Sequence, residues 1–209
     1  MKKTLRWVMI VALFLAAMYC NLFPVGHPLL VLSAPIQVRS GVVSPIHGIT
    51  RINQFDWRQY RSPQEYATWA GSTCSAASMA VVMNAYGHAY RITDVLAVES
   101  RIGAISPQFG LMAEAGIART VAYFGFQAQS GYGLSLAQII ALANRGTPVI
   151  VGFAHSGMFA GGHLLVVAGG NASTVSVVDS SPYNLTILSR GYFLQLWSGF
   201  SAVVTPRGR

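Results

Sequence analysis

The stretch Gly71-Ser-Thr-Cys-Ser-Ala-Ala-Ser-Met79, which continues to Tyr86-Gly87, carries the pattern around which this chain is organised. Ser72 or Thr73 can act as the N-cap of a helix whose apolar residues recur at helical spacing. Cys74 then falls in the first turn, where unpaired N–H groups and the helix dipole favour a thiolate. The stretch therefore predicts a helix that presents a candidate nucleophile, with an inert buried cysteine as the alternative.

Length and composition limit the classes of protein that fit. With 209 residues, of which 53% are hydrophobic, the chain can build one well-filled domain. Its formal charge of +8 reflects a shortage of Asp and Glu, and its arginines are scattered along the sequence. No block of basic residues is interleaved with aromatic residues, so we expect no nucleic-acid partner.

The N-terminus resembles a secretory signal. Lys2, Lys3 and Arg6 precede an apolar run from Trp7 to Tyr19. We expect residues 1–34 to form a signal peptide or an N-terminal membrane anchor, 35–50 a linker and 51–206 the folded domain. The protein is then extracellular or bound to the cell envelope, with membrane contact only through this segment. Removal of the leader takes away Cys20 and leaves Cys74 as the single thiol.

Local signals predict helices first and strands afterwards. Helix-starting signals stand at Ser62-Pro63, Thr93-Asp94, Ser106-Pro107 and Ser135, and glycines end the last three near residues 103, 125 and 146. Short β-branched runs over 148–153, 164–168, 175–178 and 201–205 predict strands, with a late helix over 190–197. The predicted class is α+β, with N-terminal helices packed on a C-terminal antiparallel sheet.

Two residues of the second half are candidate partners for the thiol. His163 opens one predicted strand behind Gly161-Gly162, and Asp179 follows the next predicted strand. An antiparallel hairpin would bring the start of one strand beside the end of the other, so that the carboxylate can orient the imidazole. His155 is the alternative base, and Asp179 could instead serve only as a turn former. The sequence lacks a close ligand pair such as CxxC or HExxH, so we expect no metal.

The run from Cys74 to Gly87, the Gly-Gly-His163-Leu-Leu-Val-Val segment and Val-Val-Asp179 together resemble the C39-like (papain-like) cysteine peptidases. The similarity is greatest to the stand-alone exported bacterial type and covers roughly residues 51–206. It implies a papain-like fold, hydrolysis of peptide bonds in a peptide or protein substrate, and no cofactor. Cys74 would be the nucleophile, His163 the base and Asp179 the residue that orients it.

The resemblance also implies a glutamine upstream of the cysteine that donates to the oxyanion. Gln54 fits the motif Asn-Gln-Phe-Asp but lies farther from Cys74 than is common, and Gln64 is the alternative. The backbone N–H of Cys74 would be the second donor. Two other functions stay open: acyl transfer of the transglutaminase or amidase type, and a catalytically silent domain that binds the cell envelope.

Overall fold

The computed structural model describes residues 48–208. The predicted export segment 1–34 and residues 35–47 of the predicted linker lie outside this range. The helices are η1 (Trp57–Gln59), α2 (Pro63–Trp69), α3 (Cys74–Ala85), α4 (Ile92–Arg101), α5 (Ala115–Ala122), α6 (Leu136–Asn144) and α7 (Arg190–Leu196). The strands are β1 (Ile105–Ser106), β2 (Gly110–Leu111), β3 (Phe126–Gly131), β4 (Val149–Phe153), β5 (His163–Gly170), β6 (Thr174–Val178), β7 (Ile187–Ser189) and β8 (Trp197–Pro206).

Side-chain caps explain where two of the predicted helices begin. The Ser62 hydroxyl accepts the amide of Glu65 at 3.1 Å and starts α2, whose first residue is a proline. Ser135 and Gln138 form a reciprocal capping box at the start of α6. These two helix starts are confirmed as the sequence predicts them.

The main sheet is antiparallel and has the strand order β3-β8-β4-β5-β6-β7. Strands β4 and β5 form a regular pair in which Phe153 lies opposite His163. Strands β5 and β6 pair with Val166 opposite Val178, and the register shifts between Val167 and Gly169. The predicted hairpin is therefore present, and it brings the start of β5 and the end of β6 to the same end of the sheet.

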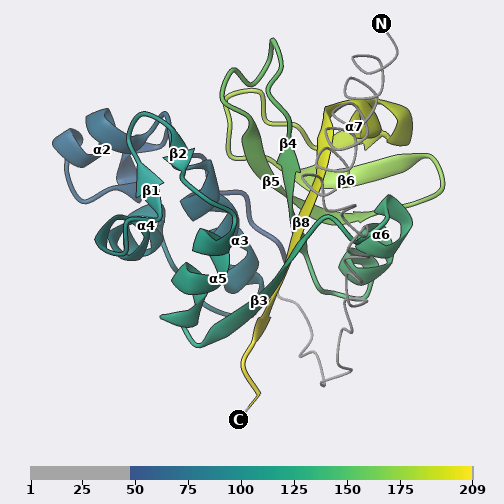
Figure 1. Cartoon of the computed structure of the whole chain (residues 1–209), viewed down its shortest axis with the longest axis horizontal. Helices are drawn as coiled ribbons and strands as arrows, with labels where there is room; N and C mark the ends of the chain where they lie inside the picture. The colour runs from purple at the N-terminus through teal and green to yellow at the C-terminus, as the bar shows by residue number, and fades with distance from the viewer. Residues whose placement is uncertain (1–47, 209) are drawn as a thin grey trace, which may run out of the picture. The chain divides into compact units, whose positions relative to one another are not determined.

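Helices cover both faces of this sheet, which explains why all five residues of β4 are buried. Ile150 and Val166 belong to a hydrophobic core shared with α3 and α4. Their neighbours Val149 and Leu165 face the other way, into a second core formed with α6 and Phe193 of α7. Figure 1 shows α3, α4 and α5 gathered on one side of the sheet and α6 and α7 on the other. The α+β class is confirmed.

One predicted helix start is wrong, because Ser106-Pro107 does not open a helix. Residues 105–111 form the small β1–β2 hairpin instead, in which Ser106 pairs with Gly110. The Ser106 hydroxyl accepts the amide of Phe109 at 3.1 Å and so closes a turn. Gly110 has a φ of +66°, a conformation that interrupts a helix. Helix α5 begins only at Ala115.

Strands β3 and β7 also differ from the prediction, since the sequence gives no clear signal for either.

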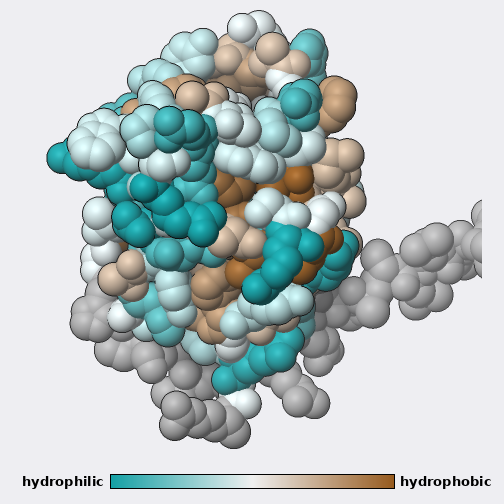
Figure 2. Space-filling model, turned by 90° about the vertical axis from the view of Figure 1, so that its left-hand side faces the viewer, coloured by the Kyte–Doolittle hydropathy of each residue, from teal (hydrophilic) through white to brown (hydrophobic). Residues whose placement is uncertain are grey.

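The helical side of the described residues is largely polar, with apolar residues gathered near the middle of that face (Figure 2). Within residues 48–208, no helix is both long and apolar enough to cross a membrane.

Candidate active site

Cys74 is the first residue of α3, and no side chain caps this helix end. The Ser72 hydroxyl donates to the Trp69 carbonyl at 3.1 Å, so it is directed away from the helix. The Thr73 hydroxyl lies 2.8 Å from the hydroxyl of Tyr60. The predicted N-cap is therefore confirmed at Thr73, but its hydroxyl makes no capping bond to the helix. The first amides of α3 remain available at the site.

Tyr60 fixes the backbone on both sides of the site. Its hydroxyl donates to the Gln54 carbonyl at 2.6 Å, so the proton between Tyr60 and Thr73 must come from Thr73. Burial raises the pKa of Tyr60 to about 12, and the phenol stays protonated. The two bonds link the segment that carries Gln54 to the residue that precedes Cys74.

His163 and Asp179 form a buried pair where β5 begins and β6 ends. The Nε2 atom of His163 lies 2.7 Å from Oδ1 of Asp179, and the side chains of these residues are 6% and 0% exposed. This bond engages one ring nitrogen and leaves Nδ1 for Cys74. The aromatic ring of Phe159 stacks on the imidazole at 4.4 Å with an interplanar angle of 8°, and so shields it from solvent.

The pair is charged near neutral pH. Burial lowers the pKa of His163, but the hydrogen bonds with Asp179 and Cys74 outweigh it and raise the pKa to about 9. Burial acts in the opposite direction on Asp179. There, hydrogen bonds from His163, Ser181 and the Leu185 amide prevail and lower the pKa to about 2. An imidazolium beside a carboxylate is the state that can stabilise a thiolate.

Gln54 lies at the same pocket, whereas Gln64 does not. Gln54 is 4% exposed, its Nε2 atom donates to the Ala70 carbonyl at 2.9 Å, and its Oε1 atom accepts the Ser180 hydroxyl at 2.8 Å. These two bonds fix the carboxamide and leave one Nε2 proton uncommitted. Gln64 lies on the exposed side of α2 and does not line the pocket.

The tripeptide 179–181 holds both Gln54 and His163, because Asp179 contacts the imidazole and Ser180 contacts the carboxamide. Ser181 returns two bonds to Asp179, from its amide to Oδ1 at 2.8 Å and from its hydroxyl to Oδ2 at 2.6 Å. Sequence reasoning missed the roles of the two serines. The turn chemistry of Asp-Ser-Ser-Pro was the available signal, since Asp side chains often bond the backbone two residues later.

The guanidinium of Arg51 hydrogen-bonds the backbone of this tripeptide, a role that sequence reasoning missed. Its Nε atom donates to the Asp179 carbonyl at 2.6 Å, and its Nη2 atom donates to the Ser181 carbonyl at 2.7 Å. The backbone N–H of Gln54 donates to the Ser180 carbonyl at 3.0 Å, so the segment 51–54 contacts the backbone carbonyls of all three residues of the tripeptide. No local pattern reveals such a contact, because 128 residues separate Arg51 from Asp179.

His155, the alternative base, lies on the exposed loop 154–162. Its Nδ1 atom hydrogen-bonds the Ala160 carbonyl within that same loop. The structure brings Asp179 to His163 and not to His155. Among residues 48–208 no group of three His, Cys, Asp or Glu side chains is arranged to hold a metal ion.

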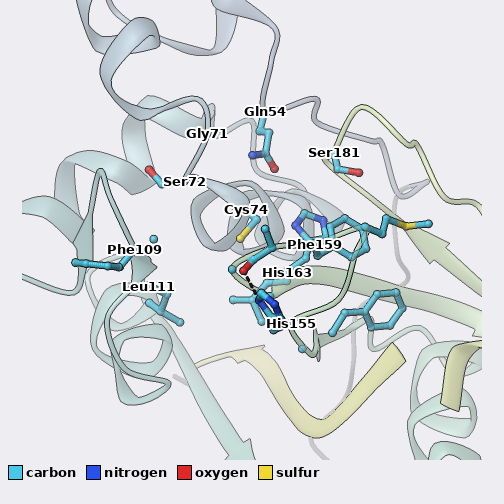
Figure 3. A pocket seen from close by; sticks show the side chains of 18 of the residues that line it. Gln54, Gly71, Ser72, Cys74, Phe109, Leu111, His155, Phe159, His163 and Ser181 are labelled. Atoms are coloured by element: carbon cyan, nitrogen blue, oxygen red, sulfur yellow. Dashed lines mark hydrogen bonds between the residues drawn. The ribbon is translucent and has the colours of Figure 1, made fainter. Parts of the chain in front are cut away.

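A pocket of about 910 Å³ opens over these groups. Gln54 and Cys74 line it from the helical side, and His163 lines it from the sheet. Figure 3 shows these three residues around one opening, with Phe109 and Leu111 on one side of it and Phe159 on the other. A thiol, an imidazole with an orienting carboxylate, and amide donors thus meet in a cavity large enough for a peptide.

This fold and this site define a cysteine peptidase of the papain-like class. A sequence model of the Peptidase C39-like family matches residues 46–203, and the chain belongs to that family. No curated protein matches the sequence significantly.

Two solved structures share the fold. The peptidase domain of Streptococcus ComA, a bifunctional ABC transporter involved in quorum sensing, has a TM-score of 0.59 at 19% identity; the similarity covers 77% of this chain and 100% of that domain. A C39-like peptidase from Bacillus anthracis has a TM-score of 0.52 at 12% identity, with 78% and 96% of the two chains covered. At these identities the comparisons establish the fold that the sequence predicts.

Proposed function

We propose that this protein hydrolyses peptide bonds and that Cys74, His163, Asp179 and Gln54 carry the reaction. The observation that supports this most is the buried His163–Asp179 pair, which leaves Nδ1 for a cysteine at a helix N-terminus. The family to which the chain belongs supports the same reaction.

In the first half of the proposed reaction, the Cys74 thiolate attacks the carbonyl carbon of the scissile peptide bond. The resulting oxyanion accepts hydrogen bonds from the free Nε2 proton of Gln54 and from the backbone N–H of Cys74. His163 then gives its Nδ1 proton to the leaving amine, the C–N bond breaks, and a thioester to Cys74 remains.

In the second half, the neutral imidazole of His163 takes a proton from water, and the hydroxide adds to the thioester. Collapse of this intermediate releases the carboxylic acid and restores the thiolate beside the imidazolium. Asp179 stays ionised throughout, because its pKa of about 2 lies far below neutral pH. Its proposed work is to orient the ring and stabilise its positive charge.

The decisive experiment compares the wild-type protein with Cys74→Ala on a mixture of peptides, with cleavage products read by mass spectrometry. We expect the variant to lose activity by several orders of magnitude while its circular dichroism spectrum is unchanged. Equal turnover by the two proteins would overturn the proposal. The same assay with an added primary amine measures acyl transfer, which predicts amine-capped products instead of free acids.

We also propose that residues 1–34 export the chain or anchor it in a membrane. The support is the charged start followed by the apolar run from Trp7 to Tyr19. Expression of the full chain in a bacterial host, followed by fractionation and N-terminal sequencing, tests this. Recovery of uncleaved protein in the cytoplasmic fraction would contradict both export and anchoring.

A further inference from the structure

Glu114 combines two features: it lines the active-site pocket, and it forms no ion pair among the described residues. Of the six Asp and Glu residues, Glu114 is the one that lines the active-site pocket. The others have intramolecular roles: ion pairs (Asp56 with Arg58, Glu65 with Arg61, Asp179 with His163), a helix cap (Asp94) and full burial (Glu99). Among the described residues the side chain of Glu114 bonds only the Tyr132 hydroxyl, which donates to Oε1.

His155 and His163 are the two basic side chains of the described residues that line the pocket beside this carboxylate. No lysine or arginine of residues 48–208 lines it. The imidazolium of His163 is already paired with Asp179 through Nε2. The Oε2 atom of Glu114 is thus an acceptor at a site where a cation from outside the chain can reach it.

Two exposed aromatic side chains also line the pocket. Phe109 at the tip of the β1–β2 hairpin is 79% exposed, and Tyr132 after β3 is 63% exposed. The ring of Tyr132 is held edge-on by Phe200, with centroids 5.8 Å apart. Exposed aromatic faces attract cations and also cover the apolar stem of a long basic side chain.

We propose that the pocket selects peptides that carry lysine or arginine, with the cationic head bound by Glu114 and the stem packed against Phe109 and Tyr132. This inference rests on the proposed function, because it names a substrate class for the same site. The tyrosine hydroxyl holds the carboxylate in place, so the interaction needs little reorganisation when the peptide binds.

A matched pair of peptides isolates the charge. Mass spectrometry of a digested peptide mixture first locates the position, relative to the cut, at which basic residues are enriched. Two peptides are then compared that differ at this position only, one with arginine and one with citrulline, its neutral isostere. We expect the wild type to prefer arginine in kcat/KM by about tenfold or more, the usual size of a charge-assisted hydrogen bond.

The variants then assign this preference to one carboxylate. In Glu114→Gln the ratio of kcat/KM for the arginine peptide to that for the citrulline peptide should fall close to one, and Glu114→Lys should favour a glutamate peptide. Asp94→Asn makes the same chemical change outside the pocket and should keep the ratio. A wild-type ratio near one, or a preference that survives in Glu114→Gln, would overturn the inference alone. If the wild type cleaves no peptide, the proposed function falls and this inference falls with it.

Discussion

The Nε2 atom of His163 lies 2.7 Å from Oδ1 of Asp179, and this bond determines which ring nitrogen is left for the thiol. It also raises the pKa of the imidazole, which reaches about 9 despite the opposing effect of burial. The proposed mechanism needs a protonated His163 to release the leaving amine. We therefore expect activity to persist through neutral pH and to fall as the pH rises through about 9.

Replacement of Asp179 by asparagine should move this alkaline limit. The neutral amide no longer stabilises the imidazolium, so the pKa of His163 falls and activity declines at a lower pH than in the wild type. The value of kcat/KM at the optimum should drop by about 10²-fold or more, as for other acid–base partners. A pH profile of kcat/KM for both proteins measures this, and an unchanged alkaline limb would contradict it.

Ser180→Ala should weaken catalysis without affecting the thiol. The lost hydroxyl donates to Oε1 of Gln54 at 2.8 Å, so the carboxamide loses one of its two restraints. We expect kcat to fall by about tenfold with little change in KM, and Gln54→Ala to cost about 10²-fold or more. Alkylation of Cys74 by iodoacetamide forms no oxyanion, so its rate should stay the same. Slower alkylation would indicate a general distortion of the site.

Arg51→Ala should lower both stability and activity. The guanidinium donates to two carbonyls of the tripeptide 179–181, and a charge-assisted bond contributes about 1.5–3 kcal/mol. Because both bonds are only partly buried, we expect less than twice this value, a loss of about 2 to 4 kcal/mol in the free energy of unfolding by urea. Arg51→Lys should restore only part of it, since an ammonium group cannot span two carbonyls as a planar fork does. A lysine variant with the full free energy of unfolding of the wild type would argue against the two bonds from the guanidinium to the carbonyls.

Glu99→Gln should stabilise the protein at alkaline pH. Glu99 is 0% exposed, and neither carboxylate oxygen has a well-formed hydrogen bond among the described residues. Burial raises its pKa to about 8 and outweighs the opposing effect of the nearby Ser75 hydroxyl. A raised carboxyl pKa favours folding below pH 4.5, and this contribution is lost as the pH rises toward 8.

The difference in Tm between Glu99→Gln and the wild type should therefore grow from pH 5 to about pH 9, because only the wild type must ionise a buried acid. Differential scanning calorimetry at several pH values measures it. Glu65→Gln is a suitable control, since Glu65 forms an ion pair with Arg61 near the surface. A difference that does not vary with pH would show that packing, and not ionisation, dominates at Glu99.

The parts of the fold that follow local rules could be predicted from the sequence. Ser135 and Gln138 mark the start of α6 through a capping box, and the valine-rich runs of β4 and β5 mark buried strands. The hairpin that joins β5 to β6 followed from turn residues between such runs. The Ser106-Pro107 signal failed because a turn and a helix start use the same residue types, and only the pairing of β1 with β2 separates them.

Features set by distant contacts could not be predicted. The sequence could not decide between Gln54 and Gln64, since what holds Gln54 at the pocket includes a bond to a serine 126 residues away. The hydrogen bonds of Arg51 to the tripeptide 179–181 likewise join segments that are far apart in the sequence. Thr73 did not act as a side-chain cap because its hydroxyl is engaged by Tyr60, thirteen residues earlier. Each of these depends on which segments meet, and local sequence does not encode that.

The position of β8 has a consequence for when this protein becomes active during its own synthesis. The strand Trp197–Pro206 lies between β3 and β4, so β3 cannot join the sheet until this last strand of the domain has been made. A nascent chain that stops before this strand has Cys74 and His163 but no complete sheet beneath them. We therefore expect the reactive centre to become active only after β8 has been synthesised and has joined the sheet.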